Sequence, residues 1–361
     1  DVCSSDLGRM SELGAYGKKV IVTGCMASVQ PGRVRIRLPD SPIVAPGDYR
    51  SFPSVAERYC GTGPGSTMPA QGATAILPIA QGCSGHCTYC ITKLARGSLC
   101  SYPVDVLANR FSAMVAGGAK EILVTAQDAA GYGGDIGTDL PSLLRRFLEV
   151  PGDYRIRIGM SNPDSVAACL PGLLEAMSDP RIYGFLHIPV QSGSDALLSA
   201  MGRKYTISEF KSLVKKIKEA MPGASIATDV ICGFPGETDG DHSKTLDLVS
   251  WLGADTVNIT RFSTRPGTKA ASMAGAVHGR ISKGRTAEVT ALKTSICLDN
   301  NWRLVGRTFR ALVTEPGKPG TVIARTRNYR PVAVSGNIPL GDFIDVKITG
   351  AEPTHLVGSP L

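Results

Sequence analysis

The sequence predicts an α/β protein whose main domain is an open, partial (β/α)6 barrel. From Ala75 to about Ile259, short apolar runs alternate with amphipathic runs, which is typical of parallel strands joined by helices. Residues 302–361 change to short alternating runs separated by Pro and Gly, which favours a small antiparallel β-barrel. With 361 residues, 43% of them hydrophobic and 19% charged, the chain can bury a substantial core.

The alternating runs define the elements of the main domain. Six strand-helix repeats imply parallel strands with right-handed crossovers, and six repeats rather than eight imply an open barrel. Gly117-Gly118 ends the first helix, and Thr206 with Glu209 forms the capping-box pattern of a helix start. The expected strands are residues 75–80, 121–125, 154–160, 184–190, 225–231 and 256–259, and the expected helices are residues 104–115, 140–150, 164–177, 206–221 and 239–252.

Composition limits the classes of function. A formal charge of +8 suggests a polyanionic partner, although diffuse excess lysine that serves solubility explains it equally well. Ten cysteines, three of them clustered, fit metal binding in a reducing cytoplasm better than a disulfide scaffold. No run of about eighteen apolar residues occurs, so we expect no membrane span and a cytoplasmic protein.

The beginning of the chain predicts a small unit of its own. Lys18-Lys19 and the apolar residues before Cys25 resemble a lipoprotein signal, but the apolar part is short and late, so a buried strand ending at Gly24-Cys25 is favoured. Residues 1–7 read like a translated sequencing adapter, which predicts a scar on a chain cut short upstream and removes Cys3 from consideration. We expect residues 8–60 to be the remnant of an α/β domain and residues 61–74, rich in Gly, Pro and Ser, to be a linker.

Three thiols follow the first strand of the main domain. Cys83, Cys87 and Cys90 form a C-x3-C-x2-C group, in which three thiolates converge on an iron-sulfur cube and leave the fourth iron without a protein ligand. A zinc knuckle and inert buried thiols are the alternatives. Structural zinc prefers four N or S ligands in paired spacings, and no second pair follows. The spacing therefore predicts an iron-sulfur cluster with one open iron.

Short polar or glycine-rich motifs recur where the expected strands end. Each motif alone reads as an ordinary turn. Five such motifs after five successive strands predict that they line one ligand-binding site, in which polar side chains form hydrogen bonds to the ligand and glycines let the backbone lie close to it. Tyr89 suits either packing on an adenine edge or ordinary barrel packing. The candidate ligand contacts are Tyr89, Gln127, Asp128, Ser161, Asn162, Gln191, Ser192, Gly233 and Arg261.

These motifs resemble those of the methylthiotransferase family of radical S-adenosylmethionine (SAM) enzymes. The resemblance rests on residues 83–90, on Ala95-Arg96-Gly97 and Ser101-Tyr102-Pro103, and on residues 187–195 and 228–238. It is closest to the archaeal and eukaryotic branch that acts on N6-threonylcarbamoyladenosine at position 37 of tRNA. It implies a radical SAM core over residues 75–301, in which SAM chelates the open iron, and a tRNA-holding TRAM domain over residues 302–361.

The resemblance also implies an amino-terminal domain with three cysteines for a second 4Fe-4S cluster. Cys25, at the end of a strand, resembles the third of these cysteines. The second would fall near Cys3, at too short an interval, and the first has no counterpart here. One thiolate does not hold a cluster, so we expect this chain to cleave SAM without inserting sulfur.

The tail carries the expected contacts to RNA. Residues 302–361 hold eight basic and four acidic side chains, and a tyrosine among arginines suits phosphate contact with base stacking, although solvated strand faces are the alternative. The TRAM expectation favours RNA. The candidate contacts are Arg307, Arg310, Arg325, Arg327, Tyr329 and Arg330.

The family chemistry implied is methylthiolation of C2 of the modified adenine. A deoxyadenosyl radical derived from SAM removes hydrogen, sulfur joins the carbon, and a further SAM supplies the methyl group. The resemblance implies a low-potential electron donor, and we expect a monomer. Two alternatives remain: a methylthiotransferase directed to a ribosomal protein, and a non-catalytic tRNA-binding iron-sulfur protein.

Overall fold

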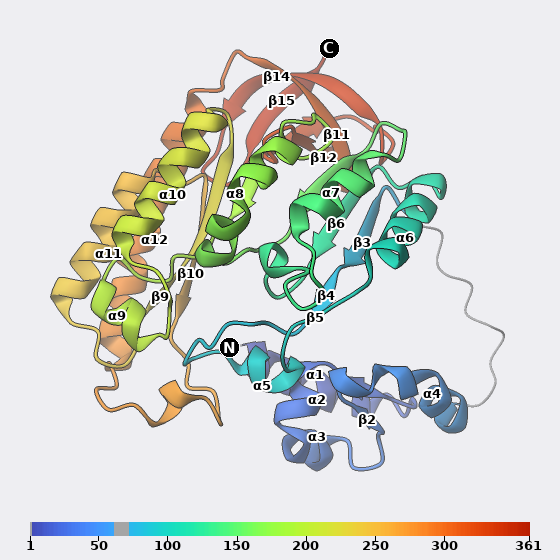
Figure 1. Cartoon of the computed structure of the whole chain (residues 1–361), viewed down its shortest axis with the longest axis vertical. Coiled ribbons are helices and arrows are strands. Elements are labelled where there is room, and N and C mark those ends of the chain that lie inside the picture. Colours follow the sequence, from blue (N-terminus) through green and yellow to red (C-terminus); the bar gives the residue numbers. More distant parts are fainter. Residues whose placement is uncertain (1, 61–71) are drawn as a thin grey trace. The chain divides into compact units, whose positions relative to one another are not determined.

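The computed structural model describes the backbone of residues 2–60 and 72–361 and the side chains of residues 8–59 and 72–361. The chain forms two compact units (Figure 1). The first comprises Asp1–Ala70, Gln81–Leu99 and Ser263–Ser272, and the second comprises Gln71–Ala80, Cys100–Phe262 and Met273–Leu361. The side chains of Cys3 and Cys60, and most of the predicted linker, lie outside the described residues.

The first unit is small and largely helical. Its two short strands pair in parallel, and Val22, Met26, Ala27, Val34 and Leu38 form its core. The strand predicted to end at Gly24-Cys25 is shorter than expected, because Cys25 already begins a helix. Its elements are α1 (Val2–Ala15), β1 (Val22–Thr23), α2 (Cys25–Val29), α3 (Pro31–Arg37), β2 (Ile43–Val44), η1 (Pro46–Ser51), α4 (Phe52–Cys60), α5 (Ile91–Arg96) and η3 (Lys269–Ser272).

The second unit contains the predicted open α/β barrel. Two three-stranded parallel sheets, β3-β6-β7 and β8-β9-β10, are linked by a parallel bridge between Ile156 and Ile182. This arrangement confirms the predicted fold class. The strands are β3 (Thr74–Pro78), β6 (Glu121–Thr125), β7 (Arg155–Ile158), β8 (Phe185–His187), β9 (Ser225–Cys232) and β10 (Thr256–Arg261), with short β4 (Ala80–Gln81) and β5 (Cys100–Ser101) between β3 and β6 along the chain.

Helices cover the outer faces of both sheets (Figure 1). Thr206 and Glu209 form the predicted capping box of α10, and Thr238 with Asp241 caps α11 in the same way. Helix α12 was not among the predicted helices because its buried positions are mostly polar, which hides the apolar period. The helices are α6 (Val104–Ala116), η2 (Ala129–Gly131), α7 (Leu140–Leu148), α8 (Pro163–Met177), α9 (Asp195–Ala200), α10 (Ile207–Ala220), α11 (Asp239–Leu252) and α12 (Gly279–Trp302).

The carboxyl-terminal part of the second unit is a closed five-stranded barrel, as predicted, in the order β11-β12-β13-β15-β14. Small and branched aliphatic side chains such as Ala311, Val313, Val332 and Leu356 fill its interior. Its last strand was missed, because Gly and Pro interrupt the apolar alternation there. The strands are β11 (Thr308–Pro316), β12 (Thr321–Thr326), β13 (Pro331–Ser335), β14 (Phe343–Ala351) and β15 (Leu356–Pro360).

The small barrel packs against the amino ends of the parallel strands. The turn between β12 and β13 holds Tyr329 at a φ of 62°, and its ring lies 4.8 Å from that of Tyr183 and 5.0 Å from that of Phe185, at the start of β8. Gly184 N donates a hydrogen bond of 2.8 Å to the carbonyl of Arg327 in the same turn. The amino ends of the parallel strands are therefore covered, and their carboxyl ends point the other way.

An ion pair strengthens this junction. Arg330 pairs with Asp255, which precedes β10, and donates a 2.6 Å hydrogen bond to Asn301 Oδ1. The Arg330 side chain is 13% exposed and that of Asp255 is 16% exposed, so both charges depend on each other rather than on water. Among the described helices, none combines the length and apolar character that crossing a bilayer requires.

Replacing Arg330 tests the junction. Arg330→Met leaves the half-buried Asp255 carboxylate without its cation, so we expect the free energy of unfolding of the second unit to fall by about 3 kcal/mol. Arg146→Ala breaks an exposed pair with Glu149 and is the control, with an expected loss of about 0.5 kcal/mol or less. Urea denaturation measures both, and equal effects would contradict the proposed importance of the junction.

Candidate active site

The three predicted cluster thiols lie on one loop of the first unit, between β4 and α5. All three side chains are half-buried. A side chain at Gly85 would place its Cβ 3.3 Å from Cys83 Sγ and 3.9 Å from Cys87 Sγ, so these two sulfurs flank the same small space. Cys90 N donates to the carbonyl of Cys87 at 3.2 Å, and Cys90 then precedes the first turn of α5.

The surroundings of these thiols fit an iron-sulfur cluster. Gly85 N donates a 3.2 Å hydrogen bond to Cys83 Sγ, the kind of contact that tunes cluster sulfurs, and the Lys93 ammonium bonds the carbonyl of Cys83. Thiolates are the ligands that iron-sulfur clusters prefer. Within the described side chains, no three His, Cys, Asp or Glu residues are grouped closely enough to hold a metal ion.

Other cysteines of the chain have a different character. Burial raises the pKa of the Cys169 and Cys232 thiols to about 11, which keeps them protonated at neutral pH. Cys297 is buried against the carbonyls of Ala254 and Asp255. These thiols serve packing.

Cys25 lies in the same unit as the three thiols. It opens α2, which packs against α5, and its sulfur accepts a 3.4 Å hydrogen bond from Arg96 Nε at the end of α5. This contact joins Cys25 to the helix that begins after Cys90. Tyr89 is half-buried beside Cys90, while the Cys3 side chain is not among those described.

In the second unit, the loops after β6 and β7 are bonded together through Asp128. Its carboxylate is 2% exposed and accepts hydrogen bonds from Asn162 N at 2.9 Å, Asn162 Nδ2 at 2.8 Å and Ser165 Oγ at 2.7 Å. Ser161 Oγ accepts from Ala130 N at 3.2 Å. Asp128, Ser161 and Asn162 thus lie together as predicted, but their bonds fix the loops as well as offering polar atoms. Gln127 is half-buried beside Asp128.

The loop after β8 is fixed by its neighbours β9 and α11. Gln191 has a φ of 75° and exchanges backbone hydrogen bonds with Asp229 and Ile231 of β9. Ser192 is fully buried, with its hydroxyl 3.4 Å from that of Thr245. Both predicted residues therefore belong to one rigid loop, and Thr245 is a supporting residue that the sequence reading missed.

The loop after β9 depends on a buried ion pair that was also missed. Gly233 has a φ of 80°, and a Cβ there would lie 2.5 Å from Ser282 Cβ on α12, so only glycine fits. Gly233 N donates to Glu237 Oε2 at 2.7 Å, and the same oxygen accepts from Arg285 of α12 at 2.7 Å. Arg285 is separated from the motif by 48 residues, so no local signal could have found it.

Arg261, the last predicted contact of this group, is exposed at the end of β10. It lines a shallow hollow with Lys283, Thr286 and Thr290 of α12. The structure therefore brings Arg261 beside α12, and no hydrogen bond joins it to the Asp128 group or to the Gln191 loop within the described part of the chain.

A row of polar side chains crosses β8, β9 and β10 below these loops. His187 Nε2 lies 2.8 Å from Asp229 Oδ1, which also accepts a 2.8 Å hydrogen bond from Asn258 Nδ2. The residues between them, such as Val230 and Val257, are buried under the helices, so the polar row faces the opposite side, the lumen of the barrel. Asp229, a charged residue in the largely apolar strand β9, is the feature of the sequence that indicates this row.

Most of the predicted RNA contacts have partners within the chain. Tyr329 and Arg330 lie in the junction described above, and Arg327 donates to the last carbonyls of α8. Arg325 pairs with Glu315 at 2.6 Å, and the exposed Arg310 pairs with Asp153 at 2.6 Å. Arg307 is exposed beside the equally exposed Arg303. A role in RNA binding stays a prediction for all six residues.

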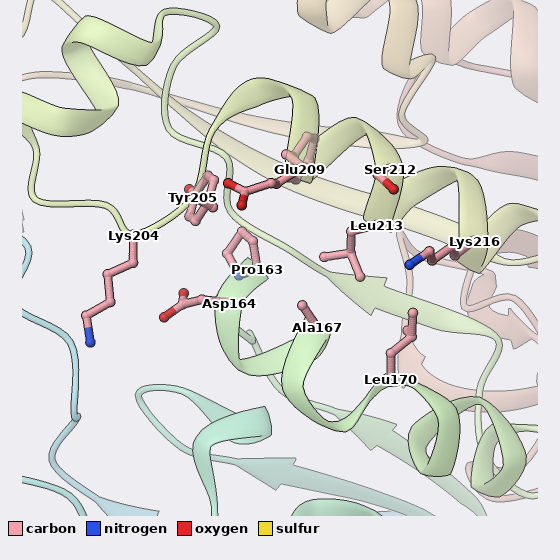
Figure 2. Close-up of a pocket in the computed structure, with 11 residues that line it drawn as sticks. Pro163, Asp164, Ala167, Leu170, Lys204, Tyr205, Glu209, Ser212, Leu213 and Lys216 are labelled. Atoms are coloured by element: carbon pink, nitrogen blue, oxygen red, sulfur yellow. The ribbon is translucent and has the colours of Figure 1, made fainter.

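A separate hollow lies between α8 and α10 on the helical layer. Its lining includes Pro163, Leu170, Leu213 and the ends of Lys204 and Lys216 (Figure 2). Figure 2 shows Pro163, Leu170 and Leu213 between the two helices and Lys204 on the loop before α10, so this hollow is bounded by the helical layer.

Comparisons with known families agree with this architecture. Residues 77–249 match the radical SAM superfamily, and residues 303–361 match the TRAM domain. The structure of the cobalamin-dependent S-adenosylmethionine radical enzyme OxsB is similar with a TM-score of 0.51 and 12% identity, covering 81% of this chain and 46% of that one. This likeness supports the fold alone.

Curated relatives share one name. A probable threonylcarbamoyladenosine tRNA methylthiotransferase of Archaeoglobus fulgidus is 36% identical over 97% of this chain and 85% of its own length. The threonylcarbamoyladenosine tRNA methylthiotransferases of Xenopus laevis and Homo sapiens are 42% and 39% identical over 79% of this chain, which corresponds to 51% and 49% of their lengths. The chain therefore belongs to the threonylcarbamoyladenosine tRNA methylthiotransferase family of radical SAM enzymes.

Proposed function

We propose that this protein methylthiolates N6-threonylcarbamoyladenosine at position 37 of tRNA. The observation that carries the proposal is the loop of three closely spaced thiols, two of which flank Gly85, in a chain that also holds a radical SAM barrel and a TRAM domain. The radical SAM match implies a 4Fe-4S cluster and SAM as cofactors.

Cys83, Cys87 and Cys90 are the residues that would hold the cluster. When both were bound, the cluster and SAM would supply the radical chemistry that removes a hydrogen atom from the base. The protein's part is placement, because such a radical reacts with whatever lies nearest. The loops after β6, β7, β8 and β9, which hydrogen bonds already hold in place, orient SAM. The walls of the lumen exclude water from the reacting atoms.

Several finer assignments belong to the same proposal. Cys25, whose sulfur accepts a hydrogen bond from Arg96, would be a ligand of a second cluster in this family. The cluster would receive its electron from a low-potential donor, and the protein would act as a monomer in the cytoplasm. Arg303 and Arg307, both exposed at the start of the TRAM domain, would contact tRNA phosphates, with weaker roles for the arginines that already have partners.

Mass spectrometry of tRNA nucleosides tests the function. Cells that lack their own enzyme are complemented with a gene in which this chain is joined to an amino-terminal domain with all three cysteines expected for the second cluster, because Cys25 alone is not expected to hold that cluster. Digested tRNA is then searched for 2-methylthio-N6-threonylcarbamoyladenosine. We expect the modified nucleoside to appear. Its absence, with unmodified N6-threonylcarbamoyladenosine retained, would contradict the proposal.

The thiol loop generates a second prediction. Cys83→Ala removes one of three ligands, so the reconstituted variant should lose both the brown chromophore and the formation of 5′-deoxyadenosine from SAM and dithionite. Cys100→Ala, an exposed free thiol in the second unit, is the control and should keep both. An unchanged chromophore in Cys83→Ala would refute the assignment.

Gly233 generates a third prediction. Gly233→Ala must move the loop away from Ser282 and strain its backbone, so the dissociation constant of SAM should rise about tenfold or more. Gly253→Ala is a matched control, because Gly253 also has a positive φ, of 56°, yet has open space around its Cα and caps α11. Isothermal titration calorimetry measures both variants, and equal affinities would exclude Gly233 from the SAM site.

A further inference from the structure

The lumen of the open barrel contains an arginine that the proposed function has not used. In β7, Ile156 and Ile158 are buried under the helices, while Arg155 and Arg157 alternate with them and face the lumen. Arg157 stands in register with Leu123 of β6. It lies two residues before Gly159, which leads into the Ser161–Asn162 loop at the predicted SAM end.

The guanidinium of Arg157 has no anionic partner. In the described part of the chain it forms neither a hydrogen bond nor an ion pair, and its Nε is fully buried with no acceptor. Buried donors in folded proteins are nearly always satisfied, because an unmade bond costs the full desolvation of the group. The arginine two residues earlier shows the usual arrangement, since Arg155 bonds Asp153 at 3.0 Å.

Two aromatic rings hold this cation in place. The Arg157 Cζ lies 5.3 Å from the ring centre of Phe185 and 5.5 Å from that of Tyr329. Stacking of this kind fixes the guanidinium plane and shields it from water, which strengthens any bond that it makes to an incoming anion. Tyr329 belongs to the TRAM domain, so the small barrel helps to build this position.

The carboxylates that share the lumen face are occupied by other groups. Glu121 accepts hydrogen bonds of 3.0 Å from both Thr74 and Tyr183, and burial raises its pKa, which favours its neutral form. Asp229 lies between His187 and Asn258. The positive charge of Arg157 is therefore not neutralised from within the lumen.

We propose that Arg157 binds the carboxylate of the threonyl substituent of the substrate base. The inference rests on the proposed function, because N6-threonylcarbamoyladenosine carries a free α-carboxylate that plain adenosine and adenosines with apolar N6 substituents lack. The two terminal nitrogens of the guanidinium can donate to the two carboxylate oxygens in a bidentate pair. A base without the carboxylate would leave the cation unpaired, which makes Arg157 a residue that sets specificity.

A substrate analogue separates recognition from structural support. Two anticodon stem-loops are compared, one with N6-threonylcarbamoyladenosine and one in which the threonyl carboxylate is a carboxamide of nearly equal size. For the unaltered protein we expect the carboxamide to raise Kd, measured by fluorescence anisotropy, and to lower kcat/KM, each by about tenfold to hundredfold.

Variants assign the effect to Arg157. Arg157→Met keeps a long side chain between the rings but removes the charge, so it should bind both stem-loops alike, with the affinity that the unaltered protein shows for the carboxamide. Arg157→Lys should retain part of the preference. Arg110→Met is the control, since Arg110 lies over Tyr102 on the exposed surface of α6 and should keep the full preference.

Two outcomes would overturn the inference. One is an unaltered protein that binds the acid and the carboxamide equally, and the other is an Arg157→Met variant that weakens both stem-loops by the same factor, which would indicate a structural role only. If the unaltered protein bound the acid stem-loop but formed no 5′-deoxyadenosine with it, the proposed function would fail while the recognition measurement still stood.

Discussion

The packing of the small barrel on the amino ends of six parallel strands is the constraint on which the rest of the second unit depends. Tyr329 fills the space beside Tyr183 and Phe185, and Arg330 neutralises Asp255. Because parallel strands share one direction, covering their amino ends assigns ligand binding to the loops at the carboxyl ends. The same contacts bring an RNA-binding module to a fixed place on a catalytic barrel.

The loops at the open end are rigid before any ligand arrives. Asp128 joins two loops, Thr245 of α11 supports a third, and the Glu237–Arg285 pair supports the fourth. Fixed polar groups of this kind need no reorganisation when SAM binds, which suits a reaction in which a free radical must meet one hydrogen atom. The supporting charges come from helices far along the chain, so the loops owe their shape to tertiary packing.

The sequence was most informative where a local rule applies. Alternating apolar runs located all six barrel strands, the Thr206–Glu209 pair located the start of α10, and the thiol spacing located the candidate cluster loop. Contacts distant in sequence were not predictable, because nothing near Glu237 indicates Arg285 and nothing near Tyr329 indicates Tyr183. The arginines of the tail read as an RNA surface, yet Arg327 and Arg330 make intramolecular bonds, since charge alone does not say which partner a side chain finds. Helix α12 was not predicted because its buried positions are mostly polar and show no apolar period.

The most direct test of the account follows the hydrogen atom. The reduced, reconstituted protein is given SAM and an anticodon stem-loop whose N6-threonylcarbamoyladenosine carries deuterium at C2, and the 5′-deoxyadenosine formed is weighed by mass spectrometry. The account predicts transfer of one deuterium into 5′-deoxyadenosine, and none when Cys83, Cys87 and Cys90 are alanine. Formation of 5′-deoxyadenosine without deuterium would contradict it, because the radical would then act elsewhere than on the base.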